Sequence, residues 1–174
     1  MDEIGDDYLD KSPDAGRMGK AAEYLVASVC ILTTRGRLNV STSLVDDEGV
    51  DLVFHLRGST ATLAVQVKAR MADGAVVGRG RFQAFIRSTT FRPRTDLDLL
   101  FVLIDNAKGA IEQAWLVPSP NFEASCGRPT TNDRFRFSAS LKAGTQDKWA
   151  QYRLSAAELP VRIMKRLEDL ENSG

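Results

Sequence analysis

The chain has 174 residues, 43% of them hydrophobic, which is enough for one substantial core but not for two. Basic and acidic residues number 23 each, so the chain lacks the basic excess typical of non-specific DNA-binding proteins. Two cysteines without metal-type spacing and a single histidine argue against a structural zinc site. The acidic N-terminus has no signal-peptide pattern and no apolar stretch reaches membrane-spanning length, so we expect a cytoplasmic protein without membrane contact.

The N-terminal part of the chain predicts an arm, a helix and a strand. Residues 1–15 are rich in acids and predict a flexible arm, which leaves residues 16–174 as a single domain. Apolar residues recur at helical spacing over 17–32, and Gly36 follows as a stop signal. A strand over 38–45 and an acidic turn come next. The domain therefore begins with a helix that leads into a sheet.

Two alternating segments, 49–57 and 61–68, predict a β-hairpin. A turn centred on Gly58 and Ser59 suits a glycine at its first central position, and it fixes the pairing of the two strands. The facing pairs then form one continuous apolar face, namely Leu52 with Val65, Phe54 with Leu63 and Leu56 with Ala61.

The opposite face of this hairpin gathers three polar side chains. Asp51 faces Gln66 directly, and Lys68 is its diagonal neighbour. Facing residues have Cβ atoms about 4.5–5.5 Å apart, and long side chains reach their diagonal neighbours. The predicted sheet thus brings a carboxylate, an amide and an ammonium group together, which is the outline of a metal-dependent phosphodiesterase site.

The remainder of the chain predicts further strands and a closing helix. After a glycine-rich loop we expect strands and one short helix in this order: strand 81–87, strand 98–105, strand 110–117, a helix from Ser119, and strand 134–141. Ser155 and Glu158 form a capping box that opens a helix to about residue 170. The order of elements predicts an α/β domain, on the borderline of α+β, with a mixed β-sheet flanked by helices.

The order of a helix with a glutamate, a strand with an aspartate and a strand with Gln-x-Lys resembles the PD-(D/E)XK nuclease superfamily. Gly49-Val50-Asp51 and Val65-Gln66-Val67-Lys68 are most similar to its Mrr-type and related branches, in which a glutamine stands where the second acid usually lies. Residues 100–105 and 114–118 also resemble the strand pair that follows the core in small bacterial members. The resemblance covers roughly residues 17–118. It implies a restriction-endonuclease-like core that hydrolyses DNA.

Two positions depart from the pattern of the superfamily. Val50 stands where a proline usually precedes the aspartate, and Gln66 supplies a neutral carbonyl in place of a carboxylate. A site with one fewer negative charge holds a divalent cation less tightly at a given geometry. We therefore expect the metal affinity of this site to be lowered.

The resemblance assigns a role to each residue of the site. Asp51 is the expected principal ligand of Mg²⁺ or Mn²⁺, with the side-chain oxygen of Gln66 as the second ligand. By resemblance, the backbone carbonyl of Val67 is a third ligand and Glu23 of the first helix completes the site. Lys68 is expected to orient or activate the attacking water and to stabilise developing charge. The candidate catalytic residues are thus Asp51, Gln66, Lys68 and Glu23.

A run of arginines without an intervening acid follows the hairpin. These candidate nucleic-acid contacts are Arg79, Arg81, Arg87, Arg92 and Arg94. Arginine side chains bind phosphates, although a solvated surface explains such a run equally well. No helix-turn-helix or zinc finger accompanies the core, so sequence specificity has to come from loops, from a homodimer or from a partner subunit.

The sequence leaves three functions open. The leading one is a metal-dependent nuclease that hydrolyses DNA phosphodiester bonds, in defence or in DNA repair. The second is a nuclease-fold module with weak or no catalysis that binds nucleic acid or a protein partner, which the balanced charge and Gln66 favour. The third is a structural domain in which Asp51, Gln66 and Lys68 are ordinary residues on the solvated face of a sheet.

Overall fold

The computed structural model describes residues 13–43 and 49–174. Most of the predicted arm and of the acidic turn lies outside the described residues. The elements are α1 (Pro13–Thr33), β1 (Leu38–Thr42), β2 (Leu52–Leu56), β3 (Thr62–Met71), α2 (Ala75–Gly78), β4 (Arg81–Arg87), β5 (Leu97–Asp105), β6 (Ala110–Pro118), α3 (Ser119–Ser125), β7 (Arg134–Ser140), η2 (Ala150–Tyr152), β8 (Arg153–Leu154) and α4 (Glu158–Asn172). Within the described ranges, no helix combines the length and the apolar character needed to cross a membrane.

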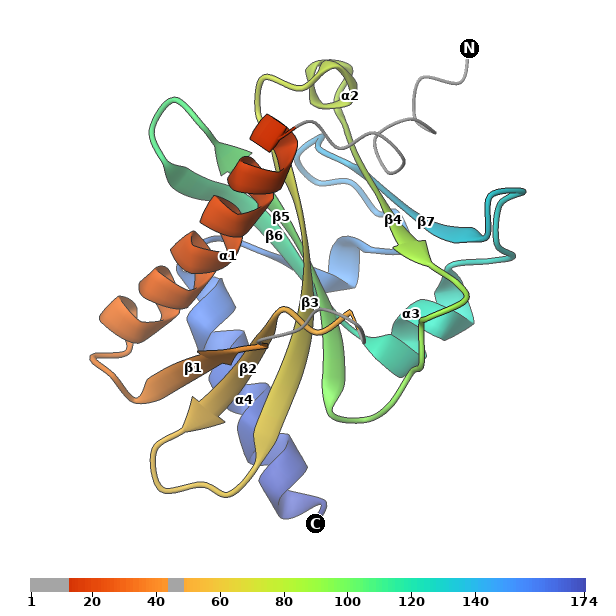
Figure 1. Ribbon diagram of the computed structural model, residues 1–174. Coiled ribbons are helices and arrows are strands. Elements are labelled where there is room, and N and C mark those ends of the chain that lie inside the picture. The colour runs from red at the N-terminus through yellow and green to blue at the C-terminus, as the bar shows by residue number, and fades with distance from the viewer. Residues whose placement is uncertain (1–12, 44–48) are drawn as a thin grey trace.

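A six-stranded sheet forms the centre of the molecule, with the strand order β1-β2-β3-β5-β6-β8. The β3–β5 pair is parallel and the other pairs are antiparallel. Helices α1 and α4 pack on one face, and a separate two-stranded sheet of β4 and β7 packs on the other (Figure 1). The predicted mixed sheet flanked by helices is confirmed.

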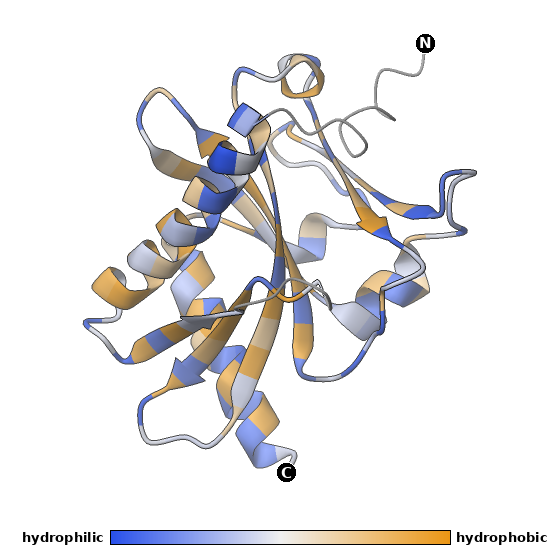
Figure 2. Cartoon of the chain, in the orientation of Figure 1, coloured by the Kyte–Doolittle hydropathy of each residue, from blue (hydrophilic) through white to orange (hydrophobic). Residues whose placement is uncertain are grey.

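The two faces of the six-stranded sheet bury different kinds of side chain. The face under α1 and α4 is mainly aliphatic. The face toward β4 and β7 is rich in aromatic rings, which are those of Phe82, Phe91, Phe101, Trp115, Phe122, Phe137 and Trp149. Figure 2 shows hydrophilic and hydrophobic residues mixed along both α1 and α4, as expected for helices that bury one side against a sheet.

The hairpin register predicted from the sequence is confirmed. The strands β2 and β3 pair through Leu52–Val65, Val53–Ala64, Phe54–Leu63 and His55–Thr62. The pairs Leu52–Val65 and Phe54–Leu63 are fully buried, in agreement with the predicted apolar face. Alternation of apolar residues fixes the register because a slip by one residue would turn the whole set toward solvent.

The predicted centre of the hairpin turn is wrong. The Ser59 N–H donates to the Leu56 carbonyl over 3.0 Å, so the central residues are Arg57 and Gly58. Gly58 has a φ of +80°, which is the requirement of the second central position in a type II turn. The glycine therefore serves the second position of the turn and not the first.

Some element boundaries also differ from the prediction. Helix α1 begins at Pro13, so the end of the predicted arm is helical, and proline suits the first turn of a helix. Strand β1 ends at Thr42, and the loop predicted over 71–80 contains the one-turn helix α2. Ser119 does not cap α3, because its hydroxyl bonds to the backbone N–H and carbonyl of Arg94 at 2.9 and 2.8 Å.

The capping box before α4 is confirmed. The Ser155 N–H donates to Glu158 Oε1 over 3.0 Å, and the Glu158 N–H donates to Ser155 Oγ over 3.2 Å. Hydrogen bonding of the carboxylate by the backbone N–H and the side chain of Ser155 lowers the pKa of Glu158. The helix that these bonds open lies across the sheet and completes the aliphatic core.

The pairing of β4 with β7 is the feature of the fold that the sequence did not predict. Both strands were expected, but β5, β6 and α3 lie between them in the chain. Nothing local indicates which strand is the partner of which. The resulting two-stranded sheet is called the ribbon below.

Candidate functional site

Asp51 lies at the open edge of β3, directly before β2 begins. Its N–H donates to the Val65 carbonyl over 3.0 Å, and its carboxylate Oδ2 accepts the Val67 N–H over 2.6 Å. Pairing of β2 with β3 ends at Leu52, so the Asp51 side chain takes the position of a neighbouring strand beyond that point. The carboxylate is thereby held, half-buried, where β3 loses its β2 neighbour.

The hydrogen-bond pattern of β3 directs a carbonyl to the same edge. The N–H groups of Ala64 and Ala72 donate to carbonyl groups on the β5 side. Successive residues of a strand point their backbone groups alternately to the two sides, so the odd-numbered residues of β3 point away from β5. The Val67 carbonyl therefore faces the edge that Asp51 occupies, as the resemblance predicts for a metal ligand.

Gln66 and Lys68 project from the face of β3 that looks toward the ribbon. Their register neighbours on β5 are Leu99 and Phe101, which belong to the aromatic core. Register neighbours share a face of the sheet, so both side chains lie on this side, each half-buried. The sequence correctly places the two residues on one face of β3 beside Asp51.

Gly49 packs closely against the Gln66 side chain. A Cβ added to Gly49 would lie 3.1 Å from the Gln66 Nε2 atom. Gly49 also has a φ of +72°, which residues with side chains adopt only with strain. A glycine is therefore required here both by the backbone conformation and by the space that the amide occupies.

Helix α1 brings two charges to this edge from the other face of the sheet. Glu23 accepts a hydrogen bond from Lys20 over 2.8 Å, and only 12% of its side chain is exposed. This hydrogen bond raises the pKa of Lys20 against the opposing effect of burial, and the charges of Glu23 and Asp51 raise it further. Lys20 thus lies within electrostatic range of both acids and links the helix to Asp51.

Lys20 is the residue of this site that the sequence analysis missed. Its spacing of three residues from Glu23 places both on one side of the helix, and this spacing was the available signal. Glu23 was predicted as a residue that completes the metal site, whereas the structure pairs it with an ammonium group. The candidate residues therefore straddle the sheet edge, with Gln66 and Lys68 on one face and Glu23 on the other.

The oxygen atoms at the edge carry little negative charge. Among residues 13–43 and 49–174, no group of three or more histidine, cysteine, aspartate or glutamate side chains is placed to hold a metal ion. The oxygens beside the Asp51 carboxylate are neutral ones, from the Gln66 amide and the Val67 carbonyl. Hard cations such as Mg²⁺ accept such oxygens and complete their shell with water and substrate phosphate. The donor set therefore fits a weakly held Mg²⁺ or Mn²⁺.

The five predicted nucleic-acid contacts have different surroundings. Arg81 and Arg87 are exposed on the same face of β4, and Arg79 is exposed just after α2. Arg94 forms an ion pair with a nearby aspartate at 2.7 Å, and Arg92 donates to a neighbouring backbone carbonyl over 2.9 Å. Arg81 and Arg87 lie on one face of β4 and belong to the ribbon.

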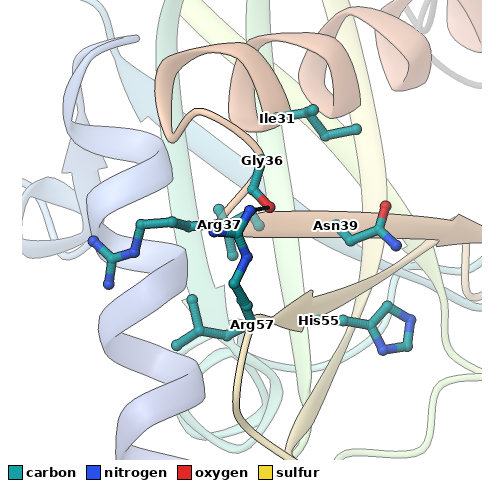
Figure 3. A pocket seen from close by; sticks show the side chains of 8 residues that line it. Ile31, Gly36, Arg37, Asn39, His55 and Arg57 are labelled. Carbon is teal, nitrogen blue, oxygen red and sulfur yellow. Dashed lines mark hydrogen bonds between the residues drawn. The ribbon is translucent and has the colours of Figure 1, made fainter.

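An open pocket of about 380 Å³ lies at the other end of β2 (Figure 3). Its lining includes Arg37, Arg57 and His55, and a guanidinium nitrogen of Arg57 lies 3.4 Å from the Gly36 carbonyl oxygen. His55 Nε2 lies 3.1 Å from a serine hydroxyl of β1. None of the candidate catalytic residues lines this pocket.

The fold is similar to that of a solved bacterial homing endonuclease, I-Ssp6803I. The TM-score is 0.56 at 18% sequence identity, and the match covers 94% of this chain and 99% of that chain. The endonuclease-like fold expected from the sequence is thus supported over almost the whole domain. No known protein family and no curated protein matches the sequence.

Proposed function

We propose that the protein is an endonuclease of the PD-(D/E)XK type that hydrolyses DNA with Mg²⁺ or Mn²⁺ held at Asp51. The observation that carries the proposal is the Asp51 carboxylate fixed by the Val67 N–H at the open edge of β3, over 2.6 Å. The likeness of the fold to a homing endonuclease supports an endonuclease as the class of enzyme.

Three groups of this edge would hold the cation, namely the Asp51 carboxylate, the Gln66 amide oxygen and the Val67 carbonyl. When bound there, the cation would supply positive charge beside the scissile phosphate and would lower the pKa of a water molecule. The Lys68 ammonium stabilises the negative charge that develops on the phosphate oxygens during attack. Each group lies on β3 or directly before β2, so the sheet sets their relative positions.

Lys20, which forms the ion pair with Glu23 on α1, adds a second ammonium group to the site beside that of Lys68. Lys20 is 55% exposed and donates a hydrogen bond to Glu23 over 2.8 Å. A phosphate at the edge competes with Glu23 for the ammonium group, because both are anionic oxygen acceptors. Binding of DNA therefore frees the Glu23 carboxylate to turn toward Asp51 and the cation.

The test is a cleavage assay on supercoiled plasmid, single-stranded DNA and single-stranded RNA, with Mg²⁺ or Mn²⁺. Asp51→Asn keeps an acceptor for the Val67 N–H but removes the charge, so we expect folded protein with a rate lowered by on the order of 10²–10³-fold or more. Lys68→Met should have an effect of similar size. Asp73→Asn is the matched control, because Asp73 is an exposed acid in the loop after β3.

A catalytically inactive nuclease-fold module is the alternative, and the Lys20–Glu23 ion pair is the observation that favours it. In such a module Asp51 and the paired Glu23, the acids of the site among the described residues, would leave too little charge for a metal. The wild-type protein would then cut none of the substrates with either metal. Equal rates for Asp51→Asn and Asp73→Asn would likewise contradict the proposed site.

A further inference from the structure

The ribbon has one face that packs on the six-stranded sheet and one that faces away from it. On the inner face Phe82 and Phe137 contact Phe101 of β5, with ring centroids 6.3 and 3.8 Å away. Side chains alternate along a strand, so every second residue of β4 and β7 belongs to the outer face. The outer residues, paired across the ribbon, are Arg81 with Ser140, Gln83 with Ser138, Phe85 with Arg136 and Arg87 with Arg134.

The outer face is cationic. Four of its eight side chains are arginines and none is acidic, in a chain whose total charge is balanced. Arg81, Arg87 and Arg136 are exposed, and they come from both strands and both ends of the ribbon. Such a concentration of charge on one regular surface of a neutral protein is complementary to a polyanion.

Contacts within the face hold these side chains in place. The guanidinium of Arg81 donates two hydrogen bonds to Ser138 Oγ, over 3.0 and 3.2 Å. The guanidinium groups of Arg134 and Arg136 lie over the Phe85 ring at 5.9 and 6.0 Å from its centroid, as in cation–π pairs. Ordering these long side chains in advance lowers the entropic cost of binding a ligand.

The centre of the face carries an amide with unused hydrogen-bonding capacity. Gln83 Nε2 lies 3.5 Å from Ser138 Oγ, and its Oε1 is buried without a hydrogen-bond partner among the described residues. An unsatisfied buried acceptor costs free energy, which a donor from a ligand would recover once the amide turns outward. Gln83 is therefore placed to recognise a ligand.

We propose that the outer face of the ribbon enters the major groove of B-form DNA and reads its sequence. A two-stranded antiparallel ribbon fits this groove in width, and arginine and glutamine are the side chains that pair with guanine and adenine edges there. Arg81, Arg87 and Arg136 contact phosphates and guanines, and Gln83 contacts an adenine. The inference rests on the proposed nuclease function, because it names duplex DNA as the substrate of that nuclease. It adds the surface that selects this substrate.

The ribbon also lies on the side of the sheet that suits this role. Gln66 and Lys68 project from the same face of β3 on which the ribbon packs, since their β5 neighbours Leu99 and Phe101 lie in the aromatic core beneath it. Strands β3 and β4 are connected through α2 and make direct contact (Figure 1). The ribbon and the Gln66 and Lys68 side chains therefore lie on the same side of the six-stranded sheet.

The first experiment measures binding without cleavage, in EDTA, on a DNA duplex of random sequence. We expect the triple variant Arg81→Ala/Arg87→Ala/Arg136→Ala to bind about 10–100-fold more weakly than the wild type. Its slope of log affinity against log salt should fall by about 0.9 for each phosphate contact that is lost. The matched control removes three exposed cations outside the ribbon, in Arg17→Ala/Arg128→Ala/Lys165→Ala. It should change affinity by less than about threefold. Equal losses in both triple variants would overturn the proposal, because net charge alone would then account for binding.

The second experiment tests reading of the groove. In a selection from random duplexes, Gln83→Ala should lose a preference for adenine at one position, by on the order of tenfold. Duplex RNA should bind more weakly than DNA, because its major groove is too deep and narrow for a ribbon. An unchanged selected sequence, a wild type that selects no sequence, or equal binding of RNA would each overturn groove reading.

The outcomes for the ribbon and for the nuclease can be told apart. The ribbon triple variant keeps Asp51, Gln66 and Lys68, so its binding in EDTA reports on the ribbon alone and cleavage reports on the catalytic edge. Ribbon-dependent binding by a wild type that cuts no substrate would refute the nuclease and keep the ribbon inference. If the ribbon triple variant instead cuts DNA with unchanged affinity and sequence preference, the ribbon inference is refuted and the nuclease is kept.

Discussion

The β2–β3 hairpin and the β4–β7 ribbon are both antiparallel pairs, yet the chain builds them in different ways. A short loop joins β2 to β3, and their alternating residues define the register. Strands β4 and β7 are separated by β5, β6 and α3, so their pairing depends on the topology of the whole domain. The candidate catalytic residues could therefore be located from local sequence, whereas the proposed DNA-reading surface emerged only from the fold.

Helix α4 and the ribbon are anchored to opposite faces of β5 by different interactions. On the helix side, Arg166 of α4 makes a bidentate ion pair with the fully buried Asp98, at 2.8 and 2.9 Å. On the ribbon side, Phe137 stacks on Phe101 with a centroid separation of 3.8 Å. Substitutions at the two anchors should accordingly differ in their dependence on pH.

The largest loss of stability is expected for Phe137→Ala. The ring is fully buried and contacts Phe82, Trp115 and Trp149 as well as Phe101. Removing such a side chain should lower the free energy of unfolding by about 3–5 kcal/mol, independently of pH. Urea denaturation followed by circular dichroism measures this loss, and a loss below about 1 kcal/mol would mean that the ribbon is not anchored by its aromatic core.

Arg166→Leu should cost somewhat less, about 2–3 kcal/mol, because 18% of the arginine side chain is exposed and solvent screens the pair. Burial raises the pKa of Asp98, and Arg166 opposes this rise. Without Arg166 the pKa rises further. In Arg166→Leu, protonation of Asp98 therefore stabilises the folded state. This stabilisation is fully present below the ordinary pKa of 3.8 and is lost as the pH rises through the raised pKa that Asp98 has in the folded protein.

The unfolding free energy of Arg166→Leu should therefore fall more steeply than that of the wild type as the pH increases from acidic to neutral. The double variant Asp98→Asn/Arg166→Leu is the control and should lack this additional slope, because no titrating carboxyl remains. Parallel pH profiles for Arg166→Leu and the wild type would show that the ion pair does not anchor α4 as described.

The smallest effect on stability, about 1–2 kcal/mol, is expected for Gly49→Ala, which imposes a side chain at positive φ. Gly58→Ala is a matched control, because its φ is +80° but its added Cβ meets no atom within 4 Å. The two variants should lose similar stability, whereas only Gly49→Ala displaces Gln66 and lowers cleavage. Equal cleavage by both variants would mean that the position of the Gln66 amide does not matter.

The sequence predicted contacts between residues that are close in the chain better than contacts between distant residues. The pairing of Leu52 with Val65 and the placement of Asp51 beside β3 depend on residues close in the chain, and period-two alternation encodes them. The engagement of Glu23 by Lys20 needed the side-chain geometry of the helix, which spacing only suggests. The turn centre was mispredicted because Gly58 fits either central position of a hairpin turn until the hydrogen bonds are known.

The pairing of the ribbon strands joins residues that are far apart in the chain. Each strand carries its own alternation, but the choice of partner is made by packing of both strands on the aromatic face of the sheet. The arginines of β4 were visible in the sequence as a run, and those of β7 were not linked to them. A charged surface that forms when two strands far apart in the chain pair therefore cannot be found by examining each segment separately.

The most direct test of the central claim, that the Asp51 edge of β3 binds a divalent metal, is metal-directed cleavage of the protein backbone. Fe²⁺ with ascorbate and peroxide produces hydroxyl radicals at sites with oxygen ligands that also accept Mg²⁺. The account predicts backbone cuts in the wild type and in Asp73→Asn beside Asp51 and between Gln66 and Lys68, and no cuts there in Asp51→Asn. Cuts elsewhere in the chain, or the same cuts in Asp51→Asn, would contradict it.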